Sequence, residues 1–164
     1  MTYYLLFVME VATRRVQFAG CTPNPDAPWM RQMAKNLTAF DDGLLNGKKY
    51  LLMDRDTKFT EGFKEITEEQ AAECVLLPPN LNANLERFFG SLKSECLDRM
   101  IFFGESSLRN AVRVWLDHYH GERPHQGLDN KLIRPGLEAG RATGDAECRE
   151  RLGGLLNYYH RRAA

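Results

Sequence analysis

Three features are scarce in this sequence: an excess of charge of one sign, long apolar runs and closely spaced cysteines. The 164 residues carry 22 basic and 22 acidic side chains, so overall charge gives no attraction to nucleic acid. No apolar run approaches the roughly 18 residues that span a bilayer. The apolar start, residues 1–9, is short and has no basic leading segment. We therefore expect a cytoplasmic protein rather than a membrane or secreted one.

The cysteines also argue against two kinds of stabilisation. They are widely and irregularly spaced and include no C-x-x-C pair, so neither a zinc site nor a disulfide framework is expected. With 43% apolar and 27% charged residues, the composition is that of an ordinary globular domain. The four side chains are expected to be buried or half-buried free thiols: Cys21, Cys74, Cys96 and Cys148.

Short β-rich segments alternate with amphipathic segments along the chain, which predicts an α/β fold with a mixed sheet flanked by helices. After Pro135 the sequence becomes rich in glycine and charge, and residues 152–159 predict a short helix or a loosely packed tail. We therefore expect a domain over residues 1–135 and a tail with a short helix over residues 136–164. Strands are predicted at residues 3–8, 15–21, 50–53 and 74–77, all in one sheet.

Two carboxylates stand where α/β proteins often place functional groups. Asp54 directly follows a predicted strand, and open α/β sheets bind ligands at the carboxyl ends of their strands. Glu86 lies in the first turn of the helix after the next strand. Either acid alone is consistent with an ordinary surface side chain, but the two together can hold a hard divalent cation. Lys93, two helical turns after Glu86, is either a DNA-phosphate contact or a solvated lysine.

The histidines allow a second kind of metal site. His118, His120 and His125, with His160 further on, are residue types that ligate transition metals. However, His118 and His120 are two residues apart and cannot share one face of a helix. Packing and polar contacts near the end of a helix are the favoured interpretation.

Five sequence motifs occur in an order typical of one family. The motifs are TRRV at residues 13–16, LLMDRDTKF at 51–59, NLNANLERFF at 80–89, LKSECL at 92–97 and HYHGERPHQGL at 118–128. Together they resemble the integrase catalytic core, the DDE transposase and retroviral-integrase-like group that includes bacterial insertion-sequence proteins. The resemblance covers nearly the whole chain and implies a ribonuclease-H-like fold that cuts and joins DNA.

The resemblance assigns roles residue by residue. Asp54 matches the second carboxylate of the catalytic triad and Glu86 the third, which implies two Mg²⁺ or Mn²⁺ ions bound there. Lys93 matches a position that faces DNA, and Arg87, beside Glu86, is a further candidate for DNA contact. Arg123 opens an Arg-Pro-His motif and is also predicted to contact DNA, although the motif's role is largely structural. The resemblance further implies a homo-oligomer that acts on mobile-element ends and target DNA.

The sequence departs from the family pattern in two places. No aspartate precedes Asp26, so the first carboxylate and the strand that bears it are expected to be missing through truncation at the N-terminus. Only 31 residues separate Asp54 from Glu86, a few fewer than the family pattern. Three hypotheses follow: a metal-dependent enzyme, an inactive remnant with weak DNA or subunit binding, or a helical interaction module in which both acids are ordinary surface residues.

Overall fold

The computed structural model describes residues 1–78, 83–137, 139 and 143–161. The chain divides into two units, one formed by Met1–Val8 and Gln17–Leu85 and the other by Met9–Val16 and Glu86–Ala164. Each unit has its own helices and hydrophobic contacts. None of the described helices is long and apolar enough to cross a membrane.

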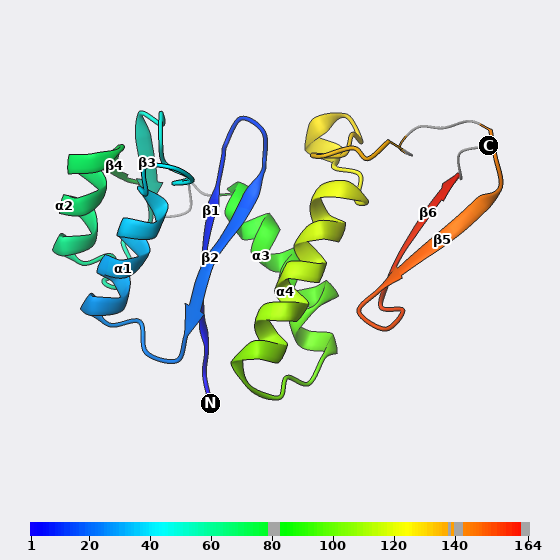
Figure 1. The fold of residues 1–164 in the computed structure, drawn as a ribbon, viewed down its shortest axis with the longest axis horizontal. Helices are drawn as coiled ribbons and strands as arrows, with labels where there is room; N and C mark the ends of the chain where they lie inside the picture. The colour runs from blue at the N-terminus through cyan, green and yellow to red at the C-terminus, as the bar shows by residue number, and fades with distance from the viewer. Residues whose placement is uncertain (79–82, 138, 140–142, 162–164) are drawn as a thin grey trace. The chain divides into compact units, whose positions relative to one another are not determined.

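The first unit contains two pairs of strands (Figure 1). β1 (Tyr4–Met9) and β2 (Val16–Thr22) form a hairpin whose tip belongs to the second unit. β3 (Tyr50–Met53) and β4 (Glu73–Leu76) pair in parallel, with Tyr50 opposite Glu73. Each strand begins and ends within one residue of its predicted range, because short apolar runs with polar or proline flanks define their own limits.

Two helices pack together in the same unit: α1 (Ala27–Leu37) and α2 (Glu61–Gln70). α1 begins at Ala27 because the Asp26 carboxylate accepts a hydrogen bond from the backbone N–H of Trp29 at 2.9 Å. It ends at Leu37, and the hydroxyl of the next residue, Thr38, donates to the carbonyl of Ala34 at 2.9 Å. Thr60 stands at the start of α2, but its side chain makes no capping hydrogen bond.

The core of the first unit lies between these helices and the strands. Met53 at the end of β3 and Phe63 in α2 are almost fully buried, and Phe63 is only 1% exposed. Val8 of β1 and Leu51 of β3 pack against this same cluster, so both strand pairs contact one core. Burial of apolar side chains is what holds them there, at about 1.5–3 kcal/mol for each fully buried large side chain. The buried members are Met30, Ala34, Leu37, Leu45, Met53 and Phe63.

The mixed α/β class is confirmed, but the predicted single sheet of four strands is wrong for the described residues. β1 pairs with β2 and β3 pairs with β4, in two separate two-stranded sheets. The apolar runs that locate each strand do not specify which strands pair, because pairing depends on contacts between segments distant in the sequence. β1 and β3 each keep one edge without a strand neighbour in the described chain.

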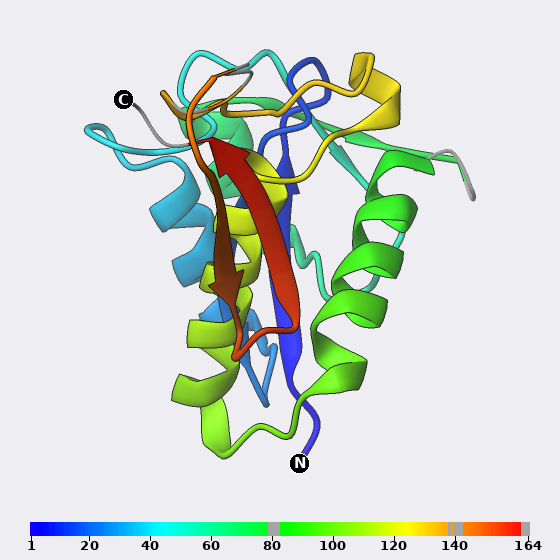
Figure 2. The same cartoon turned by 90° about the vertical axis from the view of Figure 1, so that its right-hand side faces the viewer.

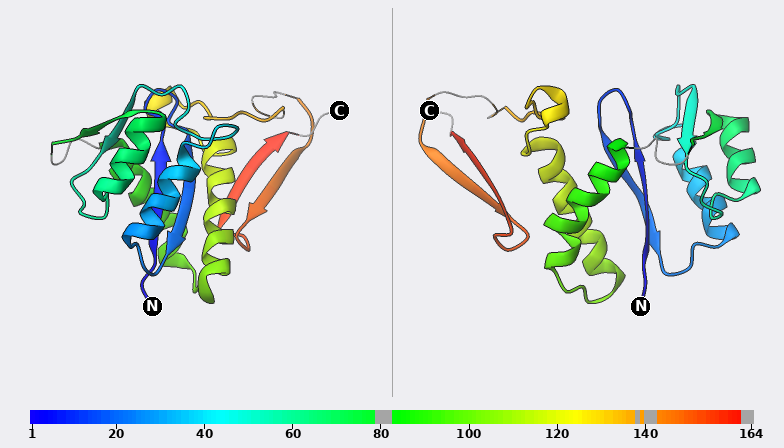
Figure 3. Two further views of the ribbon diagram at one scale, coloured as in Figure 1. Left: turned by 60° about the vertical axis from the view of Figure 1, so that its left-hand side comes forward. Right: turned by 180° about the vertical axis from the view of Figure 1, so that it is seen from behind.

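The second unit is built on two helices, α3 (Ala83–Glu95) and α4 (Gly104–Gly121), seen from two further sides in Figure 3. Short 3₁₀ turns follow each of them, η1 (Leu97–Arg99) and η2 (Gln126–Leu128). An aromatic cluster joins the helices: the Phe88 ring lies 5.5 Å from that of Trp115 and 5.3 Å from that of Tyr119. Phe88 and Trp115 have no exposed surface, so this contact is the centre of the unit's core.

The prediction of a short helix in the C-terminal tail is wrong. The chain there forms a hairpin, β5 (Ala146–Arg151) and β6 (Leu156–Arg161), which Figure 2 shows as two adjacent strands. Gly153 and Gly154 lie at φ +68° and +88°, a turn conformation that ends any helix and that glycine adopts without strain. Along β6, buried or half-buried residues, beginning with Leu156, alternate with exposed ones. This two-residue period is typical of a strand. The predicted boundary at residue 135 stays a prediction.

Candidate functional site

Asp54 lies on an exposed loop directly after β3, as the sequence predicted. One of its carboxylate oxygens accepts the backbone N–H of Asp56 at 3.0 Å, which fixes the turn. Asp56 in turn pairs with Lys58 at 3.0 Å, and the Lys58 ammonium lies over the Tyr4 ring of β1. The backbone hydrogen bond from Lys58 is the largest cause that lowers the pKa of Asp56. Sequence reasoning did not single out Lys58, which pairs with Asp56 in this loop.

Glu86 and Lys93 occupy the exposed side of α3. Seven residues make nearly two helical turns, so the two side chains share one face. The opposite side of the helix carries Phe88 and Leu92, both fully buried. Arg87 is exposed beside Glu86. Asn80 and Asn82, which the sequence offers as capping residues for this helix, lie outside the described residues.

The Arg-Pro-His motif folds back on the end of α4. The Arg123 guanidinium pairs with the Glu95 carboxylate at 2.9 Å and lies over the Tyr119 ring, 5.7 Å from its centre. The His125 Nε2–H donates to the Tyr119 carbonyl at 2.7 Å. Burial lowers the pKa of His125, partly opposed by that hydrogen bond. These contacts give the motif a clear structural role.

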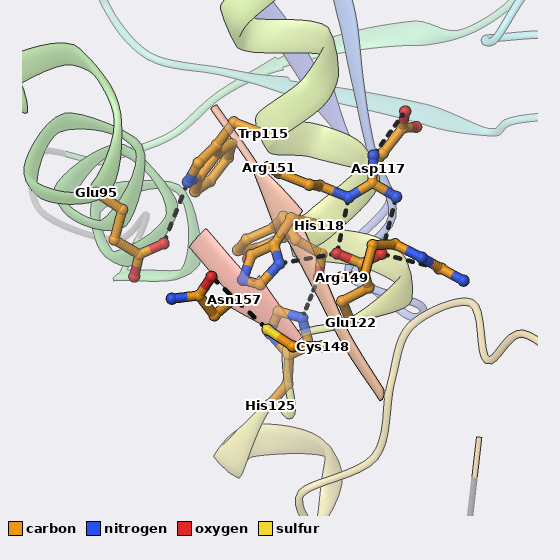
Figure 4. Close-up of polar contacts among 11 residues, drawn as sticks. Glu95, Trp115, Asp117, His118, Glu122, His125, Cys148, Arg149, Arg151 and Asn157 are labelled. Carbon is orange, nitrogen blue, oxygen red and sulfur yellow. Dashed lines mark hydrogen bonds and ion pairs between the residues drawn. The ribbon is translucent and has the colours of Figure 1, made fainter. Parts of the chain in front are cut away.

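A buried carboxylate, Glu122, gathers three donors (Figure 4). Its side chain is only 3% exposed. It accepts a hydrogen bond from His118 at 3.0 Å and one from Arg149 at 3.1 Å. Arg151 donates to both of its oxygens, each at 2.8 Å. Burial alone would raise the pKa of Glu122, but the hydrogen bonds from Arg151, His118 and Arg149 outweigh it and lower the pKa to about 2. This carboxylate ties the C-terminal hairpin to α4.

His120 holds the tip of the first hairpin. Its Nε2 accepts the backbone N–H of Val16 at 3.0 Å, a bond between residues 104 positions apart. Only the unprotonated ring nitrogen can accept, so this histidine is neutral when the bond is made. Burial is the main cause that lowers the pKa of His120 to about 4. The predicted packing of histidines near the end of this helix is thus observed for His118 and His120.

Sequence reasoning missed Glu95 and Glu122, the two acids that organise the second unit. The spacing of four between His118 and Glu122 on a helix was a usable signal. Their arginine partners lie 27 to 29 residues away, beyond any local pattern. For Glu95, the available signal was its place in the motif at residues 92–97.

The predicted metal ligands are oxygen donors of the right chemistry, since Mg²⁺ and Mn²⁺ prefer carboxylates and water. Asp54 belongs to the first unit and Glu86 to the second, so their convergence stays a prediction. Among the described residues, no group of three or more His, Cys, Asp or Glu side chains is arranged to hold a metal ion. All four cysteines are free thiols, and Cys148 is exposed rather than buried.

Comparison with known proteins gives one family and two relatives. Residues 78–132 match the family described as the Integrase core domain. An uncharacterised protein of insertion element IS476 from Xanthomonas euvesicatoria is 32% identical over 76 residues, 44% of this chain and 22% of that protein. An uncharacterised protein of insertion element IS407 from Burkholderia multivorans is 32% identical over 68 residues, 42% of this chain and 24% of that protein.

The matched stretch therefore spans about a quarter of the length of each of these curated relatives. No solved structure matches the chain significantly. The family match contains Glu86, Lys93 and the whole Arg-Pro-His motif. Residues 78–132 are therefore similar to the integrase core domain, and less than half of the chain is similar to these two insertion-element proteins.

Proposed function

We propose that this chain is the catalytic core of an insertion-element transposase, which cuts and joins DNA strands with the help of divalent metal ions. The observation that carries the proposal is the integrase-core match over residues 78–132, in which Glu86 and Lys93 share the exposed face of α3. A carboxylate that faces solvent can bind a metal ion, and an ammonium group on the same helix face can bind a DNA phosphate.

In this proposal Asp54 and Glu86 are metal ligands. Bound Mg²⁺ or Mn²⁺ would stabilise the attacking and leaving oxygens of the phosphodiester. Both carboxylates are exposed, and the turn at Asp54 leaves one of its oxygens outside the hydrogen bond to Asp56. Lys93 and Arg87 would attract and orient the DNA backbone, and the partners would be mobile-element ends and target DNA, with the chain acting as a homo-oligomer.

We further propose a ribonuclease-H-like fold in which β1–β2 and β3–β4 share one hydrophobic core. Val8 of β1 and Leu51 of β3 pack against the same core although the two strands belong to separate sheets. In the family, the strand that bears the first catalytic aspartate precedes the strand that β1 resembles. The core would then extend over residues 1–135, with the hairpin as an appended element.

Metal binding by the chain is expected to be weak, with a dissociation constant on the order of 1 mM, because two carboxylates leave most ligand positions to water. Adding Mn²⁺ should broaden the NMR amide signals around Asp54 and Glu86. Asp54→Asn and Glu86→Gln should each weaken this effect about tenfold. Asp41→Asn and Glu65→Gln, which alter other exposed acids, should leave it unchanged. Equal broadening around all exposed acids would contradict the assignment.

Cleavage is expected to depend on the additional strand. With a family-like strand bearing an aspartate fused ahead of residue 1, the protein should nick or join labelled DNA in Mg²⁺ or Mn²⁺. Asp54→Asn or Glu86→Gln should then abolish the reaction, because each removes one of few ligands. Metal-dependent cutting that survives Glu86→Gln would show that the catalytic site lies elsewhere.

A further inference from the structure

Glu95, the last residue of α3, connects its helix both to α4 and to the segment that follows α4. One carboxylate oxygen pairs with Arg123 at 2.9 Å. The other accepts a hydrogen bond from the indole N–H of Trp115 at 3.1 Å, a contact visible in Figure 4. The side chains of Glu95 and Arg123 are 28% and 32% exposed, so both are well covered for an ion pair. One oxygen of the carboxylate is therefore engaged by α4 and the other by the segment that follows it.

The partners of Glu95 are themselves held firmly. The Trp115 ring is fully buried and stacks on the Tyr119 ring at 4.9 Å between centres. Arg123 lies over that same Tyr119 ring, and His125 donates to the Tyr119 carbonyl. The carboxylate thus meets two donors whose positions are set by an aromatic cluster, which makes the contact preorganised.

Helix geometry relates this contact to the proposed site. At about 100° per residue, Glu95 lies about 180° around α3 from Glu86, nine residues earlier, and Lys93 lies on the Glu86 side. Burial agrees with this, because Phe88 is fully buried whereas Glu86 and Lys93 are exposed. Holding Glu95 against α4 therefore fixes the rotation of α3 about its own axis, with Glu86 and Lys93 directed away from α4.

We propose that Glu95 and Arg123 are a positioning pair that sets the rotation of α3 and so orients Glu86 and Lys93 for metal and DNA. Arg123 acts through Glu95 and does not touch the DNA backbone itself. The part of this inference that concerns DNA rests on the proposed function; the orientation of α3 does not. An ordinary surface ion pair would instead change the folding equilibrium by less than about fivefold and leave α3 in place.

The first experiment measures orientation without DNA. NMR residual dipolar couplings of the α3 and α4 amides are recorded for the full chain and for Glu95→Ala, Arg123→Ala and the milder Glu95→Gln. We expect the α3 couplings to change as a group relative to α4 in both alanine variants, and the Trp115 indole N–H signal to shift in Glu95→Ala. Glu105→Gln, which removes an ion pair with Arg109 within α4, is the control and should change neither. Unchanged α3 couplings in folded variants would overturn the proposal.

The second experiment separates positioning from direct contact with DNA. Fluorescence anisotropy with duplex DNA gives the affinity and its dependence on salt. We expect Glu95→Ala and Arg123→Ala each to weaken binding about threefold to tenfold, the double variant to be no weaker than either, and Arg123→Lys to restore most of the affinity. The slope against salt should stay as in the parent chain, whereas Lys93→Ala should reduce it by about one.

Direct contact would give the opposite pattern. If Arg123 touched a phosphate, Arg123→Ala would reduce the salt slope by about one, and Glu95→Ala would tighten binding by removing a negative charge. That result would overturn the DNA part of the proposal. A parent chain that bound no DNA would instead contradict the proposed function, and the dipolar couplings would still decide whether the pair orients α3.

Discussion

Glu122→Ala is expected to destabilise the second unit by about 3 kcal/mol, because it removes the acceptor from three donors at a nearly closed site. The Glu122 side chain is 3% exposed, and the variant would leave Arg151 partly buried without its main partner. The estimate lies at the lower end for a broken buried pair because Arg149 and Arg151 keep access to solvent, at 42% and 23% exposure. The C-terminal hairpin should separate from α4 first.

Urea unfolding and amide hydrogen exchange test this expectation. Trp29→Phe leaves Trp115 as the fluorescent reporter of the second unit, and exchange at β5 and α4 amides reports on the hairpin contact. Asp117→Asn is a matched control, since Asp117 approaches the same Arg151 at 3.9 Å but is 67% exposed. Asp117→Asn should lower the free energy of unfolding by less than about 1 kcal/mol. A Glu122→Ala variant no less stable than this control would refute the role given to Glu122.

Acidification is expected to destabilise the same unit through His120, by about 3 kcal/mol between pH 7 and pH 4. The pKa of His120 is about 4 in the folded protein, against 6.5 when unconstrained. The unfolded chain therefore binds the proton first, and the stabilisation present above pH 6.5 is lost as the pH falls toward 4. Burial is the main cause, and the charges of Arg134, Arg15 and His125 act in the same direction, against Asp117.

Stability measured by urea unfolding at several pH values should therefore fall steeply from pH 6.5 to 4. His120→Gln, which keeps an acceptor for the Val16 N–H but cannot titrate, should remove most of this slope. His125 should supply a smaller residual slope, because burial lowers its pKa as well. Glu122 stays ionised over this range, since its pKa is about 2. Equal pH dependence in the parent chain and His120→Gln would exclude the histidine as the cause.

The sequence predicts elements whose limits are set by neighbouring residues. β3 is predicted at its observed bounds because an apolar run meets Asp54. The C-terminal hairpin is not predicted, because leucines near residues 152 and 156 also have helical spacing. The backbone conformation of Gly153 and Gly154 and the pairing of β5 with β6 resolve this ambiguity.

In the candidate site too, features set by local sequence are predicted and features set by packing between elements are not. The sequence predicts that Asp54 follows a strand and that Glu86 and Lys93 share a helix face, since both depend on local periodicity. It does not predict the tie between Glu95 and Arg123, because an ion pair between two elements depends on how those elements pack. The motif at residues 118–128 signals that Arg123 matters but does not say which residue it meets.

The bond between Val16 and His120 also bears on the order in which the protein is made. The chain leaves the first unit after residue 8, returns after residue 16 and leaves again after residue 85. On the ribosome, the hairpin tip emerges more than 100 residues before the ring that accepts its N–H. Nascent chains stalled before residue 120 should therefore keep the tip open to proteases, and longer ones should protect it. A contact so distant along the chain makes completion of the second unit a late and slow step in folding.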